Sequence, residues 1–597
     1  MQLNGPKSEG LFFMQSVIQL NRSGPGRGRI VDSLITAHHL ESDTNSLAAH
    51  SEPRWCLLVS RFAHKRTESF RLRAMAAGQR NREMVENTKS DDFHLLRDVS
   101  WFSNLATLGL AVPSGLEFQA GLNYKATALM NANNGLALIA PRIMPVLDPW
   151  FRPAVLANHT FREQVLAGGK SVPVRLALEQ ADGSVFTFST DIFPAEHNQA
   201  AGNFTYIERF IKGLLWSRGG FRIYFDGPGA LAEELRKRWQ GTIAGRFDSN
   251  MVGERMFDHA LELVHTRDLP TERGQTRQLG RHFDGCRIGF DLGGSDRKVA
   301  AVLDGRVVFS EETVWDPCPQ RDPQYHFDGI IDSLKKAAAH LPRVDAIGGS
   351  AAGVYVNNHV KVASLFRGVP NDLFQRRVKD LFLEIRKSWN NVPLEVVNDG
   401  EVTALAGSIA LKKNAVLGIA MGTSTAGGYV NAEGNITSWL NELAFVPVDF
   451  NPAAPVDEWS GDYGCGSQYF SQQCVGRLLD VAGVDLPFEL GLPEKLKHVQ
   501  ELMPTSDHRA AKIYETIGTY LGYGIAHYAD FYDFQNVLIL GRVTSGEGGD
   551  LIINGAKHVL QTEFPELAAE IAFHVPDEKD KRHGQAVAAA SLPAIER

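Results

Sequence analysis

The sequence has few cysteines, no long apolar run and no excess of basic residues. Its five cysteines in 597 residues are too few and too scattered for a disulfide framework or paired zinc ligands, so a reducing cytoplasm is the simplest compartment. It contains no run of about 18 apolar residues, which argues against a membrane span. Lysine and arginine number 61 against 69 acidic residues, so the chain lacks the basic field that general nucleic-acid binding requires.

The composition is that of an ordinary globular protein with several folded parts. Hydrophobic residues make up 44% and charged residues 22% of the chain, which excludes collagen-like and wholly disordered classes. Because one domain usually has about 100–200 residues, the length predicts two or three domains.

Residues 1–90 differ from the rest of the chain, because they are net basic and the remainder is net acidic. They show no sustained helical or strand period and predict a disordered leader. They lack the order of a secretory signal, and they contain more acidic residues than an organellar transit peptide. Since Met75 and Met84 precede the first well-patterned segment, a start codon placed too far upstream is the alternative interpretation.

Residues 91–280 predict an α+β accessory domain. Two alternating apolar segments, residues 174–178 and 185–188, are joined by Asp182-Gly183, a dipeptide typical of a tight hairpin turn. Residues 204–216 have the apolar period of an amphipathic helix, and a buried strand and a second helix follow. No motif gives this domain a role. It could cover an active site, form a dimer contact or recognise the non-reacting end of a substrate.

Residues 281–597 place glycine-rich turns at the ends of predicted strands. The first strand runs into Gly293-Gly294-Ser295, where a Cβ would block close approach of the backbone to a phosphate. Asp291 supplies a carboxylate near the position of a hydrated Mg²⁺. Residues 422–428 form a second cradle of glycines and hydroxyls, and residues 541–549 a third flexible turn. Taken one at a time, each turn also has a purely structural interpretation.

Asp399 follows a predicted strand over residues 394–398, at the mouth of an α/β sheet where ligands bind. A carboxylate there can take the proton from a substrate hydroxyl that attacks a phosphoryl group. Asp is also a preferred N-cap residue, so capping the helix predicted over residues 401–412 is the structural alternative, and on this residue alone the favoured one.

The order of these motifs resembles the actin-like ATPase fold of sugar kinases, Hsp70 and actin, and within it the ROK family of bacterial sugar kinases and repressors. The resemblance implies a two-lobed, ribonuclease H-like α/β fold, with lobes at about 281–399 and 400–597. It implies that Asp399 is the catalytic base and that Asn398 and Glu442 contact the sugar. It implies binding of ATP phosphates or, through water, of Mg²⁺ by Asp291, Gly293, Gly294, Ser295, Gly422, Thr423, Ser424, Gly427, Gly541 and Gly546.

The sequence also departs from the family pattern. Phe445 stands where the family has a histidine, and residues 463–466 keep only a remnant of its cysteine-rich zinc motif. Cys465 and Cys474 cannot supply the usual four ligands, so no structural zinc is expected. Residues 364–368 replace the family's asparagine-containing sugar loop, so a preference for glucose is not implied.

Two charged residues, Asp296 and Lys298, follow the first phosphate turn and also depart from the pattern. An acid beside a triphosphate is electrostatically unfavourable unless it meets Mg²⁺ or an arginine such as Arg297. Whether the first turn can bind a nucleotide therefore depends on how the charge of Asp296 is balanced.

The sequence thus predicts a cytoplasmic kinase that uses ATP and Mg²⁺ to phosphorylate a carbohydrate or related polyol, with no nucleic-acid or membrane partner. Two alternatives stay open: a non-catalytic regulator that senses a sugar or nucleotide on the same fold, and an ATPase module coupled to a partner. Residues 91–280 do not show the winged helix of ROK repressors. The sugar, the phosphorylated hydroxyl and the oligomeric state, a homo-oligomer included, are left undecided.

Overall fold

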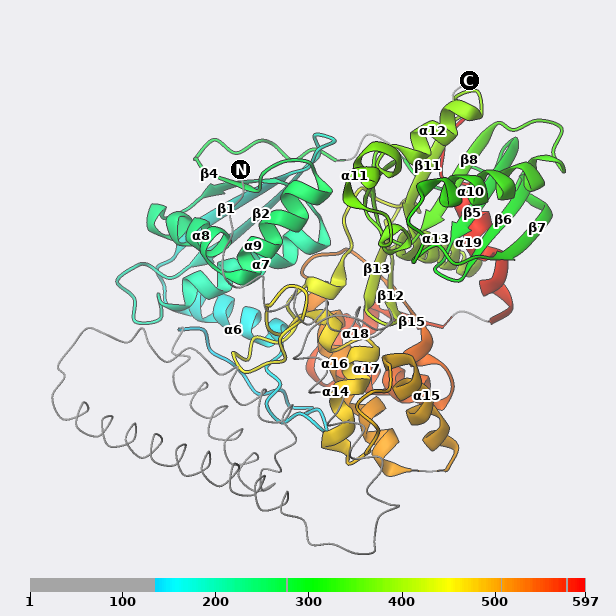
Figure 1. Cartoon of the computed structure of the whole chain (residues 1–597). Coiled ribbons are helices and arrows are strands. Elements are labelled where there is room, and N and C mark those ends of the chain that lie inside the picture. The colour runs from blue at the N-terminus through cyan, green and yellow to red at the C-terminus, as the bar shows by residue number, and fades with distance from the viewer. Residues whose placement is uncertain (1–134, 275–277, 506, 576–577, 596–597) are drawn as a thin grey trace, which may run out of the picture. The chain divides into compact units, whose positions relative to one another are not determined.

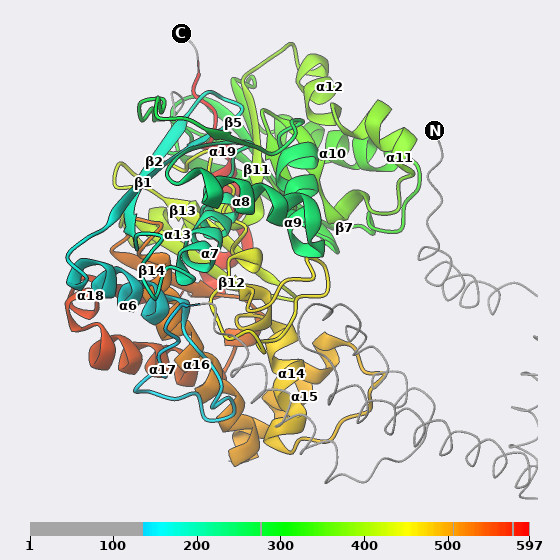
Figure 2. The same cartoon turned by 90° about the vertical axis from the view of Figure 1, so that its left-hand side faces the viewer.

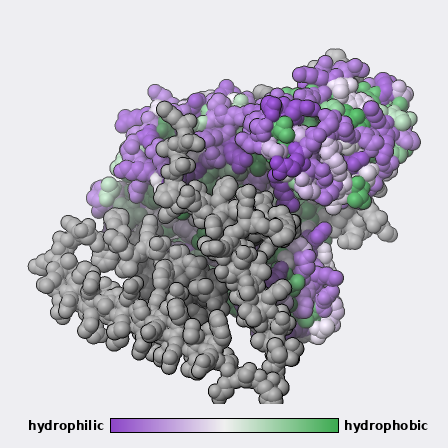
Figure 3. All heavy atoms as spheres, in the orientation of Figure 1, coloured by the Kyte–Doolittle hydropathy of each residue, from purple (hydrophilic) through white to green (hydrophobic). Residues whose placement is uncertain are grey.

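The computed structural model describes residues 135–274, 278–505, 507–575 and 578–595. The leader predicted over residues 1–90 and the first part of the accessory domain lie outside the described residues. In the described part, no helix is both long enough and apolar enough to cross a membrane. Figure 3 shows that hydrophilic side chains dominate the described surface on the face it presents.

Residues 135–274 form a four-stranded sheet with helices, which confirms the predicted α+β character (Figure 1). The strand order is β2-β1-β3-β4, and Gly183 has the positive φ that the turn between β1 and β2 requires. The strands are β1 (Val172–Glu179), β2 (Val185–Ile192), β3 (Arg222–Asp226) and β4 (Glu262–His265). The helices are α6 (Ala154–Ala167), α7 (Gly202–Ser217), α8 (Gly229–Gly241), α9 (Ile243–Asp248) and the π-helical turn η1 (Ser249–Met256).

The first lobe of the C-terminal half is built on a five-stranded sheet of order β11-β8-β5-β6-β7. Strands β5, β6 and β7 are antiparallel neighbours and form a meander, and β8 and β11 extend the sheet in parallel. The strands are β5 (Cys286–Leu292), β6 (Asp296–Leu303), β7 (Arg306–Val314), β8 (Ala346–Ala351) and β11 (Leu394–Asn398), with a separate hairpin of β9 (Val354–Val356) and β10 (His359–Val362). The helical segments are α10 (Pro323–Ala338), η2 (Ser364–Phe366), α11 (Asn371–Leu373), η3 (Phe374–Val378) and α12 (Leu381–Ser388).

The second lobe repeats this plan with four strands in the order β13-β12-β14-β15. An antiparallel hairpin is again followed by two parallel strands, so the predicted two-lobed α/β fold is confirmed. The strands are β12 (Val416–Met421), β13 (Thr425–Val430), β14 (Asn536–Leu540) and β15 (Ala572–His574). The helical segments are η4 (Leu443–Phe445), η5 (Gly466–Gln468), α14 (Gln472–Ala482), α15 (Leu492–Leu502), η6 (Met503–Thr505), α16 (His508–Tyr528), η7 (Arg542–Thr544), α17 (Glu547–Glu563) and α18 (Pro565–Glu570).

Two helices cross between the lobes. Helix α13 (Asp399–Leu411) follows the first sheet but packs on β12 and β13 of the second, whereas α19 (Glu578–Ala590) packs on β5, β6 and β8 of the first (Figures 1 and 2). The contact is close because small residues meet there. A Cβ at Gly348 of β8 would overlap the carbonyl oxygen of Ala589. Helix α13 therefore starts at the edge of the first sheet and is held by the second.

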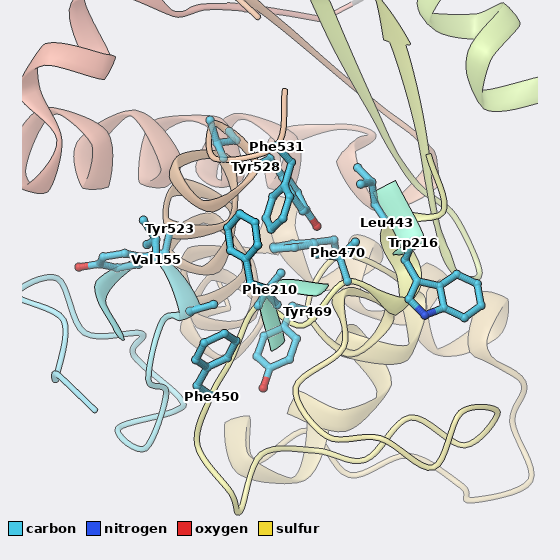
Figure 4. Close-up of a cluster of buried hydrophobic side chains, with 14 of the residues drawn as sticks. Val155, Phe210, Trp216, Leu443, Phe450, Tyr469, Phe470, Tyr523, Tyr528 and Phe531 are labelled. Atoms are coloured by element: carbon cyan, nitrogen blue, oxygen red, sulfur yellow. The ribbon is translucent and has the colours of Figure 1, made fainter. Parts of the chain in front are cut away.

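The accessory domain and the second lobe share one hydrophobic core (Figure 4). From α7, Phe210 stacks on Phe531 with ring centroids 5.1 Å apart, and Trp216 lies 4.3 Å from the ring of Phe445. Most of the apolar side chains of the first lobe form a separate cluster. Residues 135–274 are thus packed into the second lobe rather than joined to it by a linker.

Helix α7 confirms the helix predicted over residues 204–216, but its polar face is buried along with its apolar face, since 14 of its 16 residues are buried. Its charged side chains are neutralised inside the core. The Arg209 guanidinium donates to both carboxylate oxygens of Asp462, at 3.1 and 3.0 Å, and the Lys212 ammonium lies 2.8 Å from the same carboxylate. Asp248 at the end of α9 accepts a second bond from Lys212, at 3.0 Å. These cations lower the pKa of Asp462 against the opposing effect of burial.

We expect Asp462→Ala to destabilise the chain by about 3–5 kcal/mol, because it leaves two buried cations without their shared partner. The measurement is urea or thermal unfolding of the full chain. Asp372→Ala, which breaks an exposed helical pair with Arg376, is the matched control and should change little. Equal losses in the two variants would contradict the importance of the buried pair.

Candidate active site

Three carboxylates from separate segments lie within electrostatic reach of one another through Asp399. Asp291 is near the end of β5, Asp399 follows β11, and Glu442 precedes η4. Burial raises the pKa of Asp399 to about 6, and the carboxylate of Asp291 adds to this rise. Burial likewise raises the pKa of Glu442 to about 7, with a further contribution from Asp399. The structure thus brings together the predicted base, the predicted metal-side acid and the predicted sugar-binding glutamate.

The N-cap of α13 is Asn398 rather than Asp399. The Gly400 N–H donates to the side-chain oxygen of Asn398 at 2.7 Å, and the Asn398 amide donates to the carbonyl oxygen of Gly353, also at 2.7 Å. Asp399 is the first helical residue, and its carboxylate accepts only a longer bond of 3.0 Å from the same N–H. The capping role that the sequence analysis considered for Asp399 is therefore filled by Asn398.

Asp399 is thereby not needed as the helix cap, whereas the side chain of Asn398 is hydrogen-bonded to the backbone of the protein. Both groups of the Asn398 amide have protein partners, although the residue also lines a pocket described below. Asp399 lies at a helix N-terminus, whose partial positive charge favours a carboxylate. Burial still dominates, so its carboxyl titrates near neutral pH.

Four residues of the predicted phosphate turns, Gly294, Ser295, Thr423 and Ser424, are exposed at the ends of β5 and β12. An added Cβ would meet nothing closer than 4.0 Å at Gly294, and only an ordinary 3.5 Å contact at Gly422. Packing within the protein does not require glycine at these two positions. Their lack of a side chain leaves room for a ligand against the backbone, which fits the phosphates of a nucleotide.

The other predicted glycines have different surroundings. Gly427 lies inside β13, where a Cβ would crowd the carbonyl oxygen of Asn441, so packing explains this glycine. Gly541 follows β14 with a φ of +106° and fits against the backbone of Met421 at the end of β12, which brings the second and third turns together. Gly546 is exposed and has a φ of +74°.

The charge beside the first turn is balanced by Lys298, not by Arg297. The Lys298 ammonium donates to Asp296 at 2.6 Å and lies 3.7 Å from the carboxylate of Asp291, whereas Arg297 bonds Asp332 on α10. Asp291 also accepts a 2.6 Å bond from the Ser350 hydroxyl. Its carboxylate oxygens are the hard ligands that Mg²⁺ prefers, so this side of the site fits a hydrated ion. In the described part of the chain, no three His, Cys, Asp or Glu side chains are grouped to bind a metal directly.

Helix α7 positions the segment that carries Glu442. The last carbonyl groups of a helix have no partners within it. Here the carbonyl oxygens of Trp216 and Ser217 accept bonds from the N–H groups of Glu442 and Asn441, each at 2.9 Å. The accessory domain thus fixes the backbone of a predicted sugar-binding residue.

Glu401, which the sequence analysis did not select, is also part of this cluster. Its carboxylate accepts a 3.1 Å bond from the Asn441 amide and a backbone bond from Asn398, as the third helical residue of a capping box does. Burial raises its pKa to about 8, with an added effect from Glu442.

A pocket of about 130 Å³ opens beside Asn398 and Glu401. Its walls come from the accessory domain, from the first lobe and from the segment before η4. Beyond those two, the polar residues that line it are Gln180, Asp182, Tyr355, Asn357, Asn358, Glu395, Thr437 and Ser438. The sequence analysis assigned none of these eight to a binding site, because their segments meet only in the folded chain.

The sequence model of the ROK family matches residues 287–586, half of the chain. The chain belongs to the ROK family. Its C-terminal half accordingly has the actin-like ATPase fold of that family, and the three carboxylates lie within this ROK domain. A search of the curated proteins finds no match.

Solved ROK structures match the same half of the chain. The ROK hexokinase of Thermus thermophilus is 16% identical, with 51% of this chain and 96% of that chain covered and a TM-score of 0.41. A ROK glucokinase of Streptomyces griseus, solved with glucose and AMPPNP, is 20% identical over 51% and 98% of the chains, with a TM-score of 0.37. A ROK transcriptional regulator, a homologue of the E. coli MLC protein, is 18% identical over 52% and 79%, with a TM-score of 0.43.

Two of the departures from the ROK pattern lie where the accessory domain packs. Phe445, in place of the family histidine, contacts Trp216 of α7. The remnant of the zinc motif adjoins Asp462, which pairs with Arg209 and Lys212 of the same helix. In this ROK protein, contacts with α7 hold both segments.

Glu401 gives a pH-dependent contribution to stability. Because its pKa is raised from 4.5 to about 8 on folding, its contribution is full below pH 4.5 and is lost as the pH rises to about 8. We expect Glu401→Gln to reduce the fall in Tm between pH 5 and pH 8 by a few degrees, measured by thermal unfolding. The exposed Glu501→Gln is the control. Parallel Tm profiles for the parent chain and Glu401→Gln would contradict the assignment.

Proposed function

We propose that this ROK protein is an ATP-dependent kinase of a carbohydrate or related polyol. The observation that carries the proposal is the position of Asp399. Its carboxylate lies at the start of α13, one residue after the capping Asn398, and is partly buried within electrostatic reach of Asp291 and Glu442. A carboxylate with a pKa of about 6 is mostly ionised at neutral pH and is basic enough to accept a proton.

In this proposal, Asp399 takes the proton of one substrate hydroxyl. The hydroxyl oxygen forms a bond to the γ-phosphorus as the bond between that phosphorus and the ADP oxygen breaks. Glu442, beside Asp399, orients the sugar through a second hydroxyl. The location of these acids on two lobes allows closure to exclude water, which otherwise competes as acceptor.

The turns after β5 and β12 would hold the nucleotide. Bound ATP supplies the phosphoryl group, and Mg²⁺ neutralises the charge on its phosphates. The exposed backbone at Gly294 and Gly422 and the hydroxyls of Thr423 and Ser424 would bind phosphate oxygens. Asp291 would orient the water shell of the ion, with Lys298 fixing the rotamer of its carboxylate.

A second function, a sensor that binds a sugar without turnover, is favoured by one observation. Lys298 already supplies a cation to Asp291 and Asp296 at the first turn, and in that state it competes with Mg²⁺ for the same carboxylates. A chain that keeps this pair would bind sugar but transfer no phosphate.

We expect Asp399→Asn to lower sugar-dependent ADP release by roughly 10²- to 10⁴-fold, because the near-isosteric amide cannot accept the proton. The measurement is ADP release by the purified chain with Mg·ATP across hexoses, amino sugars, sugar acids and polyols. Asp372→Asn on the exposed surface is the matched control and should keep full activity.

The same panel separates the two functions. Sugar-dependent ADP release that disappears in Asp399→Asn supports the kinase. A sugar that raises the Tm of the parent chain while none releases ADP would replace the kinase with the sensor.

A further inference from the structure

The accessory domain reaches the pocket beside Asn398 through the β1–β2 hairpin. The turn residues Gln180, Ala181 and Asp182 line the pocket together with Glu401 on α13. Asp182 is exposed, and one of its carboxylate oxygens accepts bonds from the N–H and hydroxyl of Ser184, at 2.9 and 2.7 Å. These local bonds hold the turn in shape, and the second oxygen is left for other partners.

This hairpin is fastened to the second lobe by buried groups. The Gln180 amide donates to the carbonyl oxygen of Arg218, and its oxygen accepts a 2.9 Å bond from the Ser438 hydroxyl. Arg218 lies over the ring of Trp439, 3.3 Å from the centroid, and over Phe186 of β2 at 4.1 Å. The wall formed by the hairpin and residues 437–440 is therefore one packed structure.

The opposite wall of the pocket comes from the first lobe and is also fixed by hydrogen bonds. Asn357 and Asn358 form the β9–β10 turn, both with positive φ. The Asn358 amide donates to the Leu394 carbonyl at 3.0 Å, and its oxygen accepts the Val396 N–H at 2.7 Å. The turn is thus tied to β11, the strand that leads to Asn398 and Asp399. A ligand in the pocket would lie between this turn and the accessory hairpin.

The pocket is about the size of one sugar ring. One water-sized group needs roughly 10–15 Å³ of such space, so about 130 Å³ holds on the order of ten, close to the number of heavy atoms in a hexose. Its lining combines carboxylates, amides and hydroxyls with apolar side chains such as Phe257 and Val354. Few, well-placed polar groups among apolar ones are typical of small-molecule sites.

The charge of the lining has one sign. Asp182 and Glu395 contribute carboxylates, whereas the carboxyl group of Glu401 has a pKa raised to about 8 and is mostly protonated at neutral pH. Among the lining residues that the structure describes, none is lysine, arginine or histidine. Arg218 stacks on Trp439 but is not among them. An acidic substituent would meet like charge in a partly buried space, whereas hydroxyl groups would find acceptors.

We propose that the β1–β2 hairpin is a specificity element that contacts the non-reacting end of the carbohydrate and excludes substrates with an acidic group there. The inference rests on the proposed function, because it assigns the sugar to the cavity that begins at Asn398. It gives the accessory domain a direct part in substrate recognition, through Asp182.

The test compares binding of matched neutral and acidic sugars: glucose with glucuronate, mannose with mannuronate and galactose with galacturonate. Binding to the full chain is measured by calorimetry, since a uronate can lack the hydroxyl that is phosphorylated. We expect a neutral sugar to bind at least about tenfold more tightly than its uronate. Asp182→Lys should reduce this ratio by about tenfold or more, and Asp182→Asn, which keeps an acceptor for Ser184, by less.

Asp191→Lys, on β2 at the opposite end of the same hairpin, is the matched control and should leave the ratio unchanged. A uronate that binds as well as its neutral partner, or an equal effect of Asp182→Lys and Asp191→Lys, would overturn the inference. If a sugar binds but no ADP is released, only the kinase proposal is contradicted. The ratio of neutral-sugar to uronate affinity then still tests the role of the hairpin. If no sugar binds, both fail.

Discussion

The packing of a fully buried helix, α7, is the interaction on which the active-site region depends. Burying Arg209 and Lys212 carries a large desolvation cost, which is offset because Glu208, Asp462 and Asp248 pair with them inside the core. With the helix fixed, its terminal carbonyls bind the backbone of Asn441 and Glu442. The accessory domain, the segment that carries Glu442 and the second lobe are therefore packed together, and Phe445 and Asp462, where the chain departs from the ROK pattern, lie in these contacts.

The two crossing helices connect this unit to the first lobe. Helix α13 begins at the edge of the first sheet and packs on the second, so any movement between the lobes moves Asp399 relative to one of them. The tight fit of α19 on Gly348 ties the end of the chain to the first sheet. Asp291 belongs to the first lobe and Glu442 to the second, and both lie near Asp399. A movement of one lobe toward the other would therefore change the distances among these three acids.

Local patterns predicted much of this structure, and long-range contacts account for the rest. The Asp182-Gly183 turn, the β5 glycine turn and the strand ending at Asn398 are short-range signals, and the motif order indicated the ROK family. The burial of α7 was not predictable from its period, because Asp462 lies far along the chain. Two details could have been found: Asp296 and Lys298 share one face of a strand, and Asn398 with Glu401 fits a capping box. The walls of the pocket come from segments that lie far apart in the sequence, and no single-segment pattern reveals them.

The most direct test of this account is a crystal structure of the full chain with a non-hydrolysable ATP analogue and a sugar that raises its Tm. The account predicts phosphates at the turns after β5 and β12, one sugar hydroxyl within hydrogen-bond distance of Asp399, and the far end of the sugar against Gln180 and Asp182. A sugar bound elsewhere, or one whose hydroxyls do not reach Asp399, would contradict it.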